Sequence, residues 1–234
     1  MSQAFPQSLW SQIRQTFAHA LDIGALKPIP TSYEWVEQDG ISFLIRIVDN
    51  LWRKERAAAR GKASPKPANF NPFLPYDEDL FVCNLSASHC ILLNKFNVMD
   101  HHILIVTREF ESQQNWLTLQ DFEAIQKVIQ EIDGLGFYNG GKLAGASQPH
   151  KHLQLVPLPL SSEGPKFPFA PCLESLHSDP KLTTANAFPY PHRICSTPAL
   201  DAPEQWFLSY AQLMKQIGMG NPQHHENPRA HIIS

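Results

Sequence analysis

Two histidines and a glutamine occupy alternate positions in the stretch GASQPHKHLQLVPLP, residues 145–159. Successive side chains of a β-strand point to opposite faces, so His150, His152 and Gln154 would lie side by side on one face. The leucines between them would point the other way, toward a hydrophobic core. The spacing therefore predicts a strand that presents two imidazole rings and an amide on one face.

Several kinds of site could use this pattern. A single histidine on a strand is usually a surface residue or a core residue with satisfied hydrogen bonds, but three polar groups in register argue against that role. A metal site would need a third strong ligand, and Gln154 is a poor ligand for zinc. Its amide is a good hydrogen-bond donor to a phosphate oxygen. A neutral imidazole can attack phosphorus and hold the group as a phosphoramidate, so we favour a nucleophilic histidine.

The glycine-rich passage GLGFYNGGKLAGASQ, residues 134–148, leads directly into the predicted strand. Its last four residues, Gly145, Ala146, Ser147 and Gln148, can offer backbone N–H groups and a hydroxyl to phosphate oxygens. Such a passage can also be an ordinary connection in which glycines allow tight turns. Phosphoryl chemistry depends mainly on positioned donors and cations, so its place before the histidines favours an anion cradle.

The elements that would position these residues indicate a single α+β domain over residues 1–234. Apolar residues recur at helical spacing in three segments, which are 8–26, 117–132 (capped by Thr118) and 203–218. Strands of an antiparallel sheet are expected in four segments, which are 79–85, 89–96, 101–110 and 150–158. Asp39-Gly40 between two alternating runs in 32–48 indicates a hairpin. The proline-rich segment 157–200 has no clear period and is expected to cross the surface.

Composition excludes several classes of protein. A hydrophobic content of 43% is that of an ordinary globular domain, and a net charge of −3 argues against general affinity for nucleic acid. The sequence has neither an apolar run long enough for a membrane span nor a secretory signal at its N-terminus. Four cysteines without paired spacing indicate reduced thiols, so we expect a cytoplasmic protein.

Several motifs together identify a family. HKHLQ resembles the His-x-His-x-Gln signature of the transferase branch of the histidine-triad superfamily. NPFLPYDEDLFV, LLNKFNV, ILIVTREFESQ and NGGKLAGASQPHKHLQLVPLP resemble diadenosine tetraphosphate phosphorylases, also called ATP adenylyltransferases. The likeness runs from about residue 40 to 160 and continues more weakly through AFPYPHRI, residues 187–194. It implies a histidine-triad-like antiparallel sheet with flanking helices and the nucleophile on a central strand.

The resemblance also implies roles for the residues of the signature and the loop before it. His152 is similar to the nucleophile that becomes adenylylated, and His150 would support the same constellation. Gln154 would hold an oxygen of the α-phosphate. Asn139 and the stretch Gly145–Gln148 resemble the phosphate-binding residues of the family.

Three further residues resemble nucleotide contacts of the family. Asn94 and Lys95, within LLNKF, are similar to a pair that contacts the nucleotide. Lys54 is similar in position to a lysine that meets the polyphosphate. Members of the family continue with a strand and loop beyond the point that RAHIIS would occupy, so this chain is expected to lack the family's C-terminal end.

The implied activity is nucleotidyl transfer. His152 would attack the α-phosphate of diadenosine tetraphosphate and release ATP, and inorganic phosphate would then accept AMP to give ADP; the reverse reaction joins ADP and ATP. Mg²⁺ or Mn²⁺ bound with the nucleotide would fit this chemistry, without a metal site on the protein. The alternatives are another nucleotidyltransferase or hydrolase of the superfamily, which usually has a third histidine where Gln154 stands, and a dinucleotide-binding protein without turnover.

Overall fold

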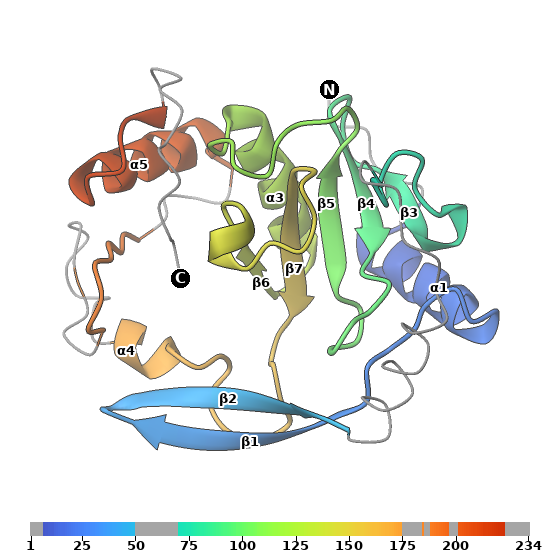
Figure 1. Cartoon of the computed structure of the whole chain (residues 1–234), viewed down its shortest axis with the longest axis horizontal. Helices are drawn as coiled ribbons and strands as arrows, with labels where there is room; N and C mark the ends of the chain where they lie inside the picture. Colours follow the sequence, from blue (N-terminus) through green and yellow to red (C-terminus); the bar gives the residue numbers. More distant parts are fainter. Residues whose placement is uncertain (1–6, 50–69, 175–183, 185–187, 197–200, 223–234) are drawn as a thin grey trace.

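A five-stranded antiparallel sheet forms the centre of the protein (Figure 1). The computed structural model describes residues 7–49, 70–174, 184, 188–196 and 201–222. In chain order the strands are β3 Phe81–Asn84, β4 His89–Leu93, β5 Ile103–Thr107, β6 Gly134–Phe137 and β7 His152–Pro157. Their order across the sheet is β3-β4-β5-β7-β6, so β7 lies between β5 and the edge strand β6. The predicted α+β class is confirmed.

Helices cover one face of this sheet. They are α1 Leu9–Asp22 and α3 Leu119–Glu131, with α5 Pro203–Gln216 packed on α3. The main hydrophobic core lies between these helices and the strands, and its members include Leu9, Ile13, Ile91, Ile105, Val128, Leu153 and Leu155. The three predicted helices are therefore confirmed. Within the described residues, no helix is both long and apolar enough to cross a bilayer.

Thr118 caps α3 as predicted, and the cap extends into a capping box. Its hydroxyl accepts from the Asp121 backbone N–H at 3.4 Å, and the Asp121 carboxylate accepts from the Thr118 backbone N–H at 2.7 Å. Reciprocal bonds of this kind satisfy N–H groups that the first helical turn would otherwise leave unpaired. The capping box thereby fixes the carboxylate of Asp121 on the helix-covered side of the sheet, where it also contacts His89 and Lys151.

The opposite face of the sheet carries a smaller apolar cluster. It comprises Phe73, Cys90, Leu92, Leu104 and Val106. Because the side chains of a strand alternate, His152 and Gln154 of β7 share this second face with Leu104 and Val106, their register partners on β5. The predicted inward direction of the intervening leucines is confirmed, since Leu153 and Leu155 lie in the helix-covered core.

A separate two-stranded hairpin lies beside the main sheet (Figure 1). Its strands are β1 Thr31–Gln38 and β2 Ile41–Val48. Asp39 and Gly40 have φ angles of 53° and 77°, so both turn residues are left-handed, as an Asp-Gly hairpin requires. Arg46 donates to the carbonyl of Leu160 at 2.8 Å, which ties the hairpin to the chain that leaves β7.

The sheet contains one strand, β6, that was not predicted from the sequence. β6 lies within the glycine-rich passage, and its sequence GLGF lacks the β-branched residues that usually mark a strand. Close packing explains the glycine at its first position, because a Cβ on Gly134 would lie 2.7 Å from Cδ2 of the buried Leu155. The predicted strand 150–158 begins later, at His152, and the short helix α4 Ala170–Glu174 lies in the predicted surface segment.

We expect Gly134→Ala to lower the free energy of unfolding by about 1–3 kcal/mol, because the new methyl group would displace Leu155 in a filled core. Urea denaturation measures the change. Gly140→Ala is the matched control: a Cβ there meets only Tyr138, at 3.8 Å, so stability should change by less than about 0.5 kcal/mol. Equal stabilities of the two variants would contradict the packing argument.

Candidate active site

One hydrogen bond decides the protonation pattern of the His152 ring. Nδ1 lies 2.7 Å from the carbonyl oxygen of His150, and because a carbonyl only accepts, Nδ1 carries the proton. Nε2 therefore keeps its lone pair. The residue is only 3% exposed, and burial lowers its pKa below the usual 6.5, which keeps the ring neutral at pH 7. This is the form of imidazole that can act as a nucleophile.

The backbone of His152 is held by a buried amide. Oε1 of Gln113 accepts from the His152 N–H at 2.7 Å, and Nε2 of Gln113 donates to the His152 carbonyl at 3.1 Å. The same Nε2 donates to the carbonyl of Asn139 at 2.9 Å. Gln113 thus replaces a neighbouring strand at this point, since β6 pairs with β7 only as far as Gln154. Gln113 was not among the predicted site residues, although it ends the family segment ILIVTREFESQ.

Both ring nitrogens of His150 are occupied. Nε2 lies 2.8 Å from the carbonyl of Thr107, to which it must donate. Nδ1 accepts from Nδ2 of Asn71 at 3.0 Å; the orientation of that amide follows from its Oδ1, which accepts from the Phe73 N–H. The ring is fully buried, and burial lowers its pKa. His150 thus orients the nucleophile through its backbone carbonyl.

The contacts of the three predicted side chains agree with their alignment on one face. His152 and Gln154 lie in β7 on one face, whereas His150 precedes the strand and forms an isolated bridge with Ser112. Lys151, between the two histidines, reaches Asp121 on the helix-covered face, so the alternation continues through His150. On the other face, the edge of the Phe73 ring contacts both imidazoles, with centroids 5.6 Å from His150 and 5.3 Å from His152.

Gln154 contacts a histidine that sequence analysis did not select. Its Oε1 lies 3.1 Å from Nε2 of His102, and Nδ1 of His102 lies 3.2 Å from Nδ2 of Asn94. Asn94, a predicted nucleotide contact, therefore belongs to the same group of polar side chains. Lys95, its predicted companion, forms an ion pair with Asp77 at 2.9 Å. The only signal for His102 was its place in HH directly before an apolar strand.

The end of the glycine-rich passage forms a compact turn. The N–H of Gly145 donates to the carbonyl of Lys142, and the N–H of Ala146 donates to that of Gly141, each at 3.1 Å. These two amides are engaged inside the turn, so an anion cradle here would depend on Ser147, Gln148 and nearby side chains. The role of this stretch and of Asn139 stays a prediction, and Lys54 lies outside the described residues.

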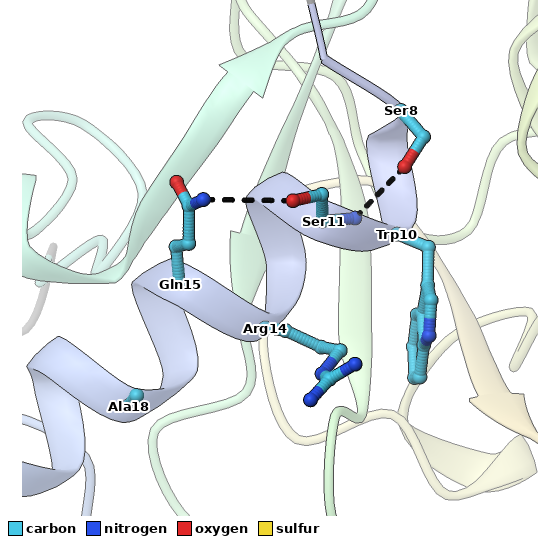
Figure 2. A pocket seen from close by; sticks show the side chains of 6 residues that line it. All are labelled: Ser8, Trp10, Ser11, Arg14, Gln15 and Ala18. Atoms are coloured by element: carbon cyan, nitrogen blue, oxygen red, sulfur yellow. Dashed lines mark hydrogen bonds between the residues drawn. The ribbon is translucent and has the colours of Figure 1, made fainter.

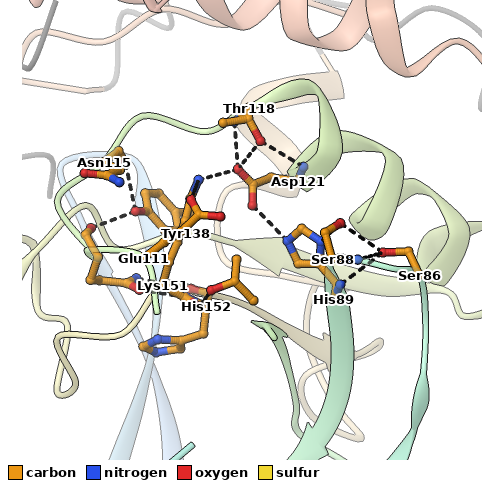
Figure 3. A network of polar contacts seen from close by, with 12 residues as sticks. Ser86, Ser88, His89, Glu111, Asn115, Thr118, Asp121, Tyr138, Lys151 and His152 are labelled. Atoms are coloured by element: carbon orange, nitrogen blue, oxygen red, sulfur yellow. Dashed lines mark hydrogen bonds and ion pairs between the residues drawn. The ribbon is translucent and has the colours of Figure 1, made fainter. Parts of the chain in front are cut away.

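A buried charged cluster supports the strand from the helix side (Figure 3). Lys151 is fully buried, and its ammonium lies 2.6 Å from Asp121 and 3.2 Å from Glu111. Asp121 also meets Nε2 of His89 at 3.0 Å. Burial opposes ionisation of Asp121, but the hydrogen bond from His89 and the charge of Lys151 outweigh it and hold its pKa below the usual range. Figure 3 shows Lys151 reaching Asp121 while the His152 ring points away.

A hollow of about 530 Å³ lies elsewhere, on the outer surface of α1 (Figure 2). It is lined by Ser8, Trp10, Ser11, Arg14, Gln15 and Ala18. Because α1 packs on the face of the sheet opposite to His152, this hollow is separate from the histidine site. Among the described residues, no three His, Cys, Asp or Glu side chains gather closely enough to hold a metal ion.

A protein-family model and individual curated proteins both match this chain. The family model described as Ap4A phosphorylase N-terminal domain matches residues 1–175. Diadenosine tetraphosphate phosphorylase 2 of Saccharomyces cerevisiae is 38% identical over 103 residues, which are 38% of this chain and 32% of the relative. Protein APA1 of the same yeast is 30% identical over 170 residues, 67% of this chain and 51% of APA1. The matched region therefore spans about half or less of these relatives.

Solved structures show the same fold. The crystal structure of yeast Ap4A phosphorylase Apa2 in complex with Ap4A has a TM-score of 0.70 and 27% identity, covering 91% of this chain and 74% of Apa2. A second crystal structure of yeast Apa2 has a TM-score of 0.71 and 23% identity, covering 91% of this chain and 72% of Apa2. The agreement extends over most of the present chain.

We expect Lys151→Met to lower the free energy of unfolding by about 3–5 kcal/mol, because it leaves the Asp121 carboxylate buried without its cation. The control is Lys166→Met, which removes an exposed ion pair with Asp133 and should cost less than about 1 kcal/mol. Both are measured by urea denaturation. Similar losses in the two variants would show that the buried pair has no special weight.

The His152 ring should stay neutral at pH 7 and gain its second proton only below pH 6.5, because burial lowers its pKa. The unfolded chain binds this proton more readily, so the stability due to the neutral ring is complete above pH 6.5 and is lost as the pH falls through the folded-state pKa. A pH titration of the ring signals by NMR gives the pKa directly. A value at or above 6.5 would contradict this assignment.

Proposed function

This chain belongs to the Ap4A phosphorylase N-terminal domain family, and on that premise we propose that it phosphorolyses diadenosine tetraphosphate to ATP and ADP through an adenylylated histidine. The resemblance found in the sequence is confirmed by the family match. One observation carries the proposal for this chain: His152 donates from Nδ1 to the His150 carbonyl and keeps a lone pair on Nε2. That nitrogen is the nucleophile the reaction needs.

The proposed reaction has two displacements at the same phosphorus. Nε2 of His152 attacks the α-phosphorus, the bond from phosphorus to the bridging oxygen breaks, and ATP leaves. AMP is then held through a phosphorus–nitrogen bond, and the ring carries a positive charge that the Nδ1–H bond to the His150 carbonyl stabilises. An oxygen of inorganic phosphate attacks next, the phosphorus–nitrogen bond breaks, and ADP leaves with His152 restored.

The remaining predicted residues take supporting roles in this proposal. The Gln154 amide would donate to an oxygen of the α-phosphate, where negative charge increases in the transition state. Asn139 and the stretch from Gly145 to Gln148 would contact the other phosphates. Asn94, Lys95 and Lys54 would contact the nucleotide or its polyphosphate chain, as the family resemblance implies.

Yeast Apa2, which has the same fold, has been crystallised with AMP and with Ap4A, and this supports small nucleotides as the ligands here. Mg²⁺ or Mn²⁺ bound with the polyphosphate stays part of the proposal, as do ADP, ATP and phosphate as substrates. No step of the mechanism depends on a metal. We also infer a cytoplasmic location, which the scattered spacing of the four cysteines in the sequence supports.

Two other activities remain distinguishable from phosphorolysis. A hydrolase of the same superfamily would pass AMP to water, but Gln154 occupies the position where such hydrolases usually have a third histidine. A protein that binds dinucleotides without turnover would release no product. The products formed with and without phosphate separate all three.

We expect the purified protein to convert diadenosine tetraphosphate to ATP and ADP only when phosphate is present. His152→Ala should lower the rate by roughly 10⁴-fold or more, because the covalent carrier is lost, with little change in thermal unfolding. Product nucleotides are separated by anion-exchange chromatography, and His19→Ala is the control because that histidine is exposed on α1. AMP as the product, or turnover by His152→Ala, would contradict the proposal.

A further inference from the structure

We propose that His102, held by Asn94, is a positioning residue that orients the Gln154 carboxamide so that its N–H group faces the reacting phosphate. This inference rests on the proposed function for the identity of the phosphate. Among the described residues, one series of side-chain hydrogen bonds reaches Gln154, and it runs from Asn94 through His102. Neither His102 nor this use of Asn94 follows from the motif that contains the nucleophile.

The three side chains belong to residues that lie in, or directly next to, three neighbouring strands. Asn94 follows β4, His102 precedes β5 and Gln154 lies in β7; the Asn94 N–H also donates to the His102 carbonyl at 2.9 Å. Leu104 on β5 is the register partner of Gln154, so His102, two residues earlier, has its side chain on the same face. The geometry of the sheet therefore brings them together, and no loop has to order for the contact to form.

The direction of each hydrogen bond in this series follows from the bond that Asn94 makes with the backbone of Phe96. Oδ1 of Asn94 accepts from the Phe96 N–H at 3.3 Å, so Nδ2 is the group that faces His102. Nδ2 has only protons to offer, which makes Nδ1 of His102 the acceptor, at 3.2 Å. The proton of a neutral ring must then lie on Nε2, which donates to Oε1 of Gln154 at 3.1 Å.

The hydrogen bond from His102 determines whether the oxygen or the nitrogen of the Gln154 carboxamide faces a ligand. With Oε1 occupied by His102, the amide nitrogen is the end left to meet a ligand. If the carboxamide rotated by half a turn, its N–H groups would face the N–H of His102, and its oxygen would face the phosphate oxygens. Both contacts are repulsive, so the hydrogen-bond chain selects the orientation that can donate to phosphate.

The surroundings of His102 keep the ring in this neutral form. The residue is 8% exposed, and burial lowers its pKa to about 4, so it is uncharged at neutral pH. Its ring also lies against Phe137 of β6, with centroids 6.1 Å apart. A protonated ring would direct an N–H at the Asn94 amide, which has no acceptor on that side. The neighbours thus support one tautomer, with the proton on Nε2.

The proposal predicts an effect on the rate of transfer that acts through Gln154 alone. A donor aimed at developing charge contributes mainly in the transition state, so its misplacement lowers kcat more than it raises KM. A residue that only filled space would instead change stability, with the same kinetic effect whether Gln154 was present or not. A pair of variants at each position separates these cases.

We expect His102→Leu to lower kcat for phosphorolysis by about ten- to a hundredfold, with KM within about threefold, because Gln154 loses its anchor. His102→Gln can still donate from its own Nε2 and should remain within about threefold of the wild-type rate. In a Gln154→Ala background, His102→Leu should lower kcat by less than about twofold further. Thermal unfolding shows whether each variant is folded. If His102→Leu is misfolded, the rates of His102→Gln and the wild-type protein are compared instead.

Three kinetic outcomes would overturn the proposal. They are an unchanged kcat in His102→Leu, an equal loss in His102→Leu and His102→Gln, and an equal loss of rate with and without Gln154. The ring tautomer gives a readout that needs no turnover: nitrogen-15 NMR of the unliganded protein should show the proton of His102 on Nε2, and a proton on Nδ1 would overturn the chain. Failure of the wild-type protein to release ATP would contradict the proposed function, while the tautomer would still decide the hydrogen-bond chain.

Discussion

Lys151 carries its ammonium into the space between the sheet and α3, where an unpaired charge would be strongly destabilising. Only one placement of β7 over α3 brings it to Asp121, and Asp121 is itself fixed by the capping box of Thr118. A shift of one residue would send the lysine to the opposite face and bring a histidine against the carboxylate. The buried pair therefore sets the register of the strand, and with it the face on which His152 and Gln154 appear.

On that face, the chemistry depends on the direction of hydrogen bonds more than on charge. Three buried histidines have lowered pKa values, and each has a different role. His150 uses both ring nitrogens to hold its own place, His152 keeps one nitrogen free, and His102 passes an orientation from Asn94 to Gln154. A neutral imidazole can both donate and accept, which is what each of these roles requires.

Much of this arrangement could be predicted from the sequence because it follows from local patterns. The alternation in HLQL places His152 and Gln154 on one face and the leucines in the core, and the Asp-Gly turn and the Thr118 cap depend on a few adjacent residues. What could not be predicted depends on contacts between distant segments. Gly134 and Gly136 of β6 face Leu155 and Ile125, which leave little room for a side chain, and His150 pairs with Ser112 of a distant segment. Gln113 and His102 likewise act on residues far from them in the sequence.

The bonds made by Gln113 have a mechanical consequence. A single amide nitrogen donates to both the carbonyl of His152 and the carbonyl of Asn139, which lies in the glycine-rich passage two residues after β6. Displacement of this passage would pull on the same nitrogen that steadies the strand. The position of the His152 backbone and the position of the passage are therefore coupled through Gln113. A ligand that moved the passage would also change the hydrogen bond that holds His152.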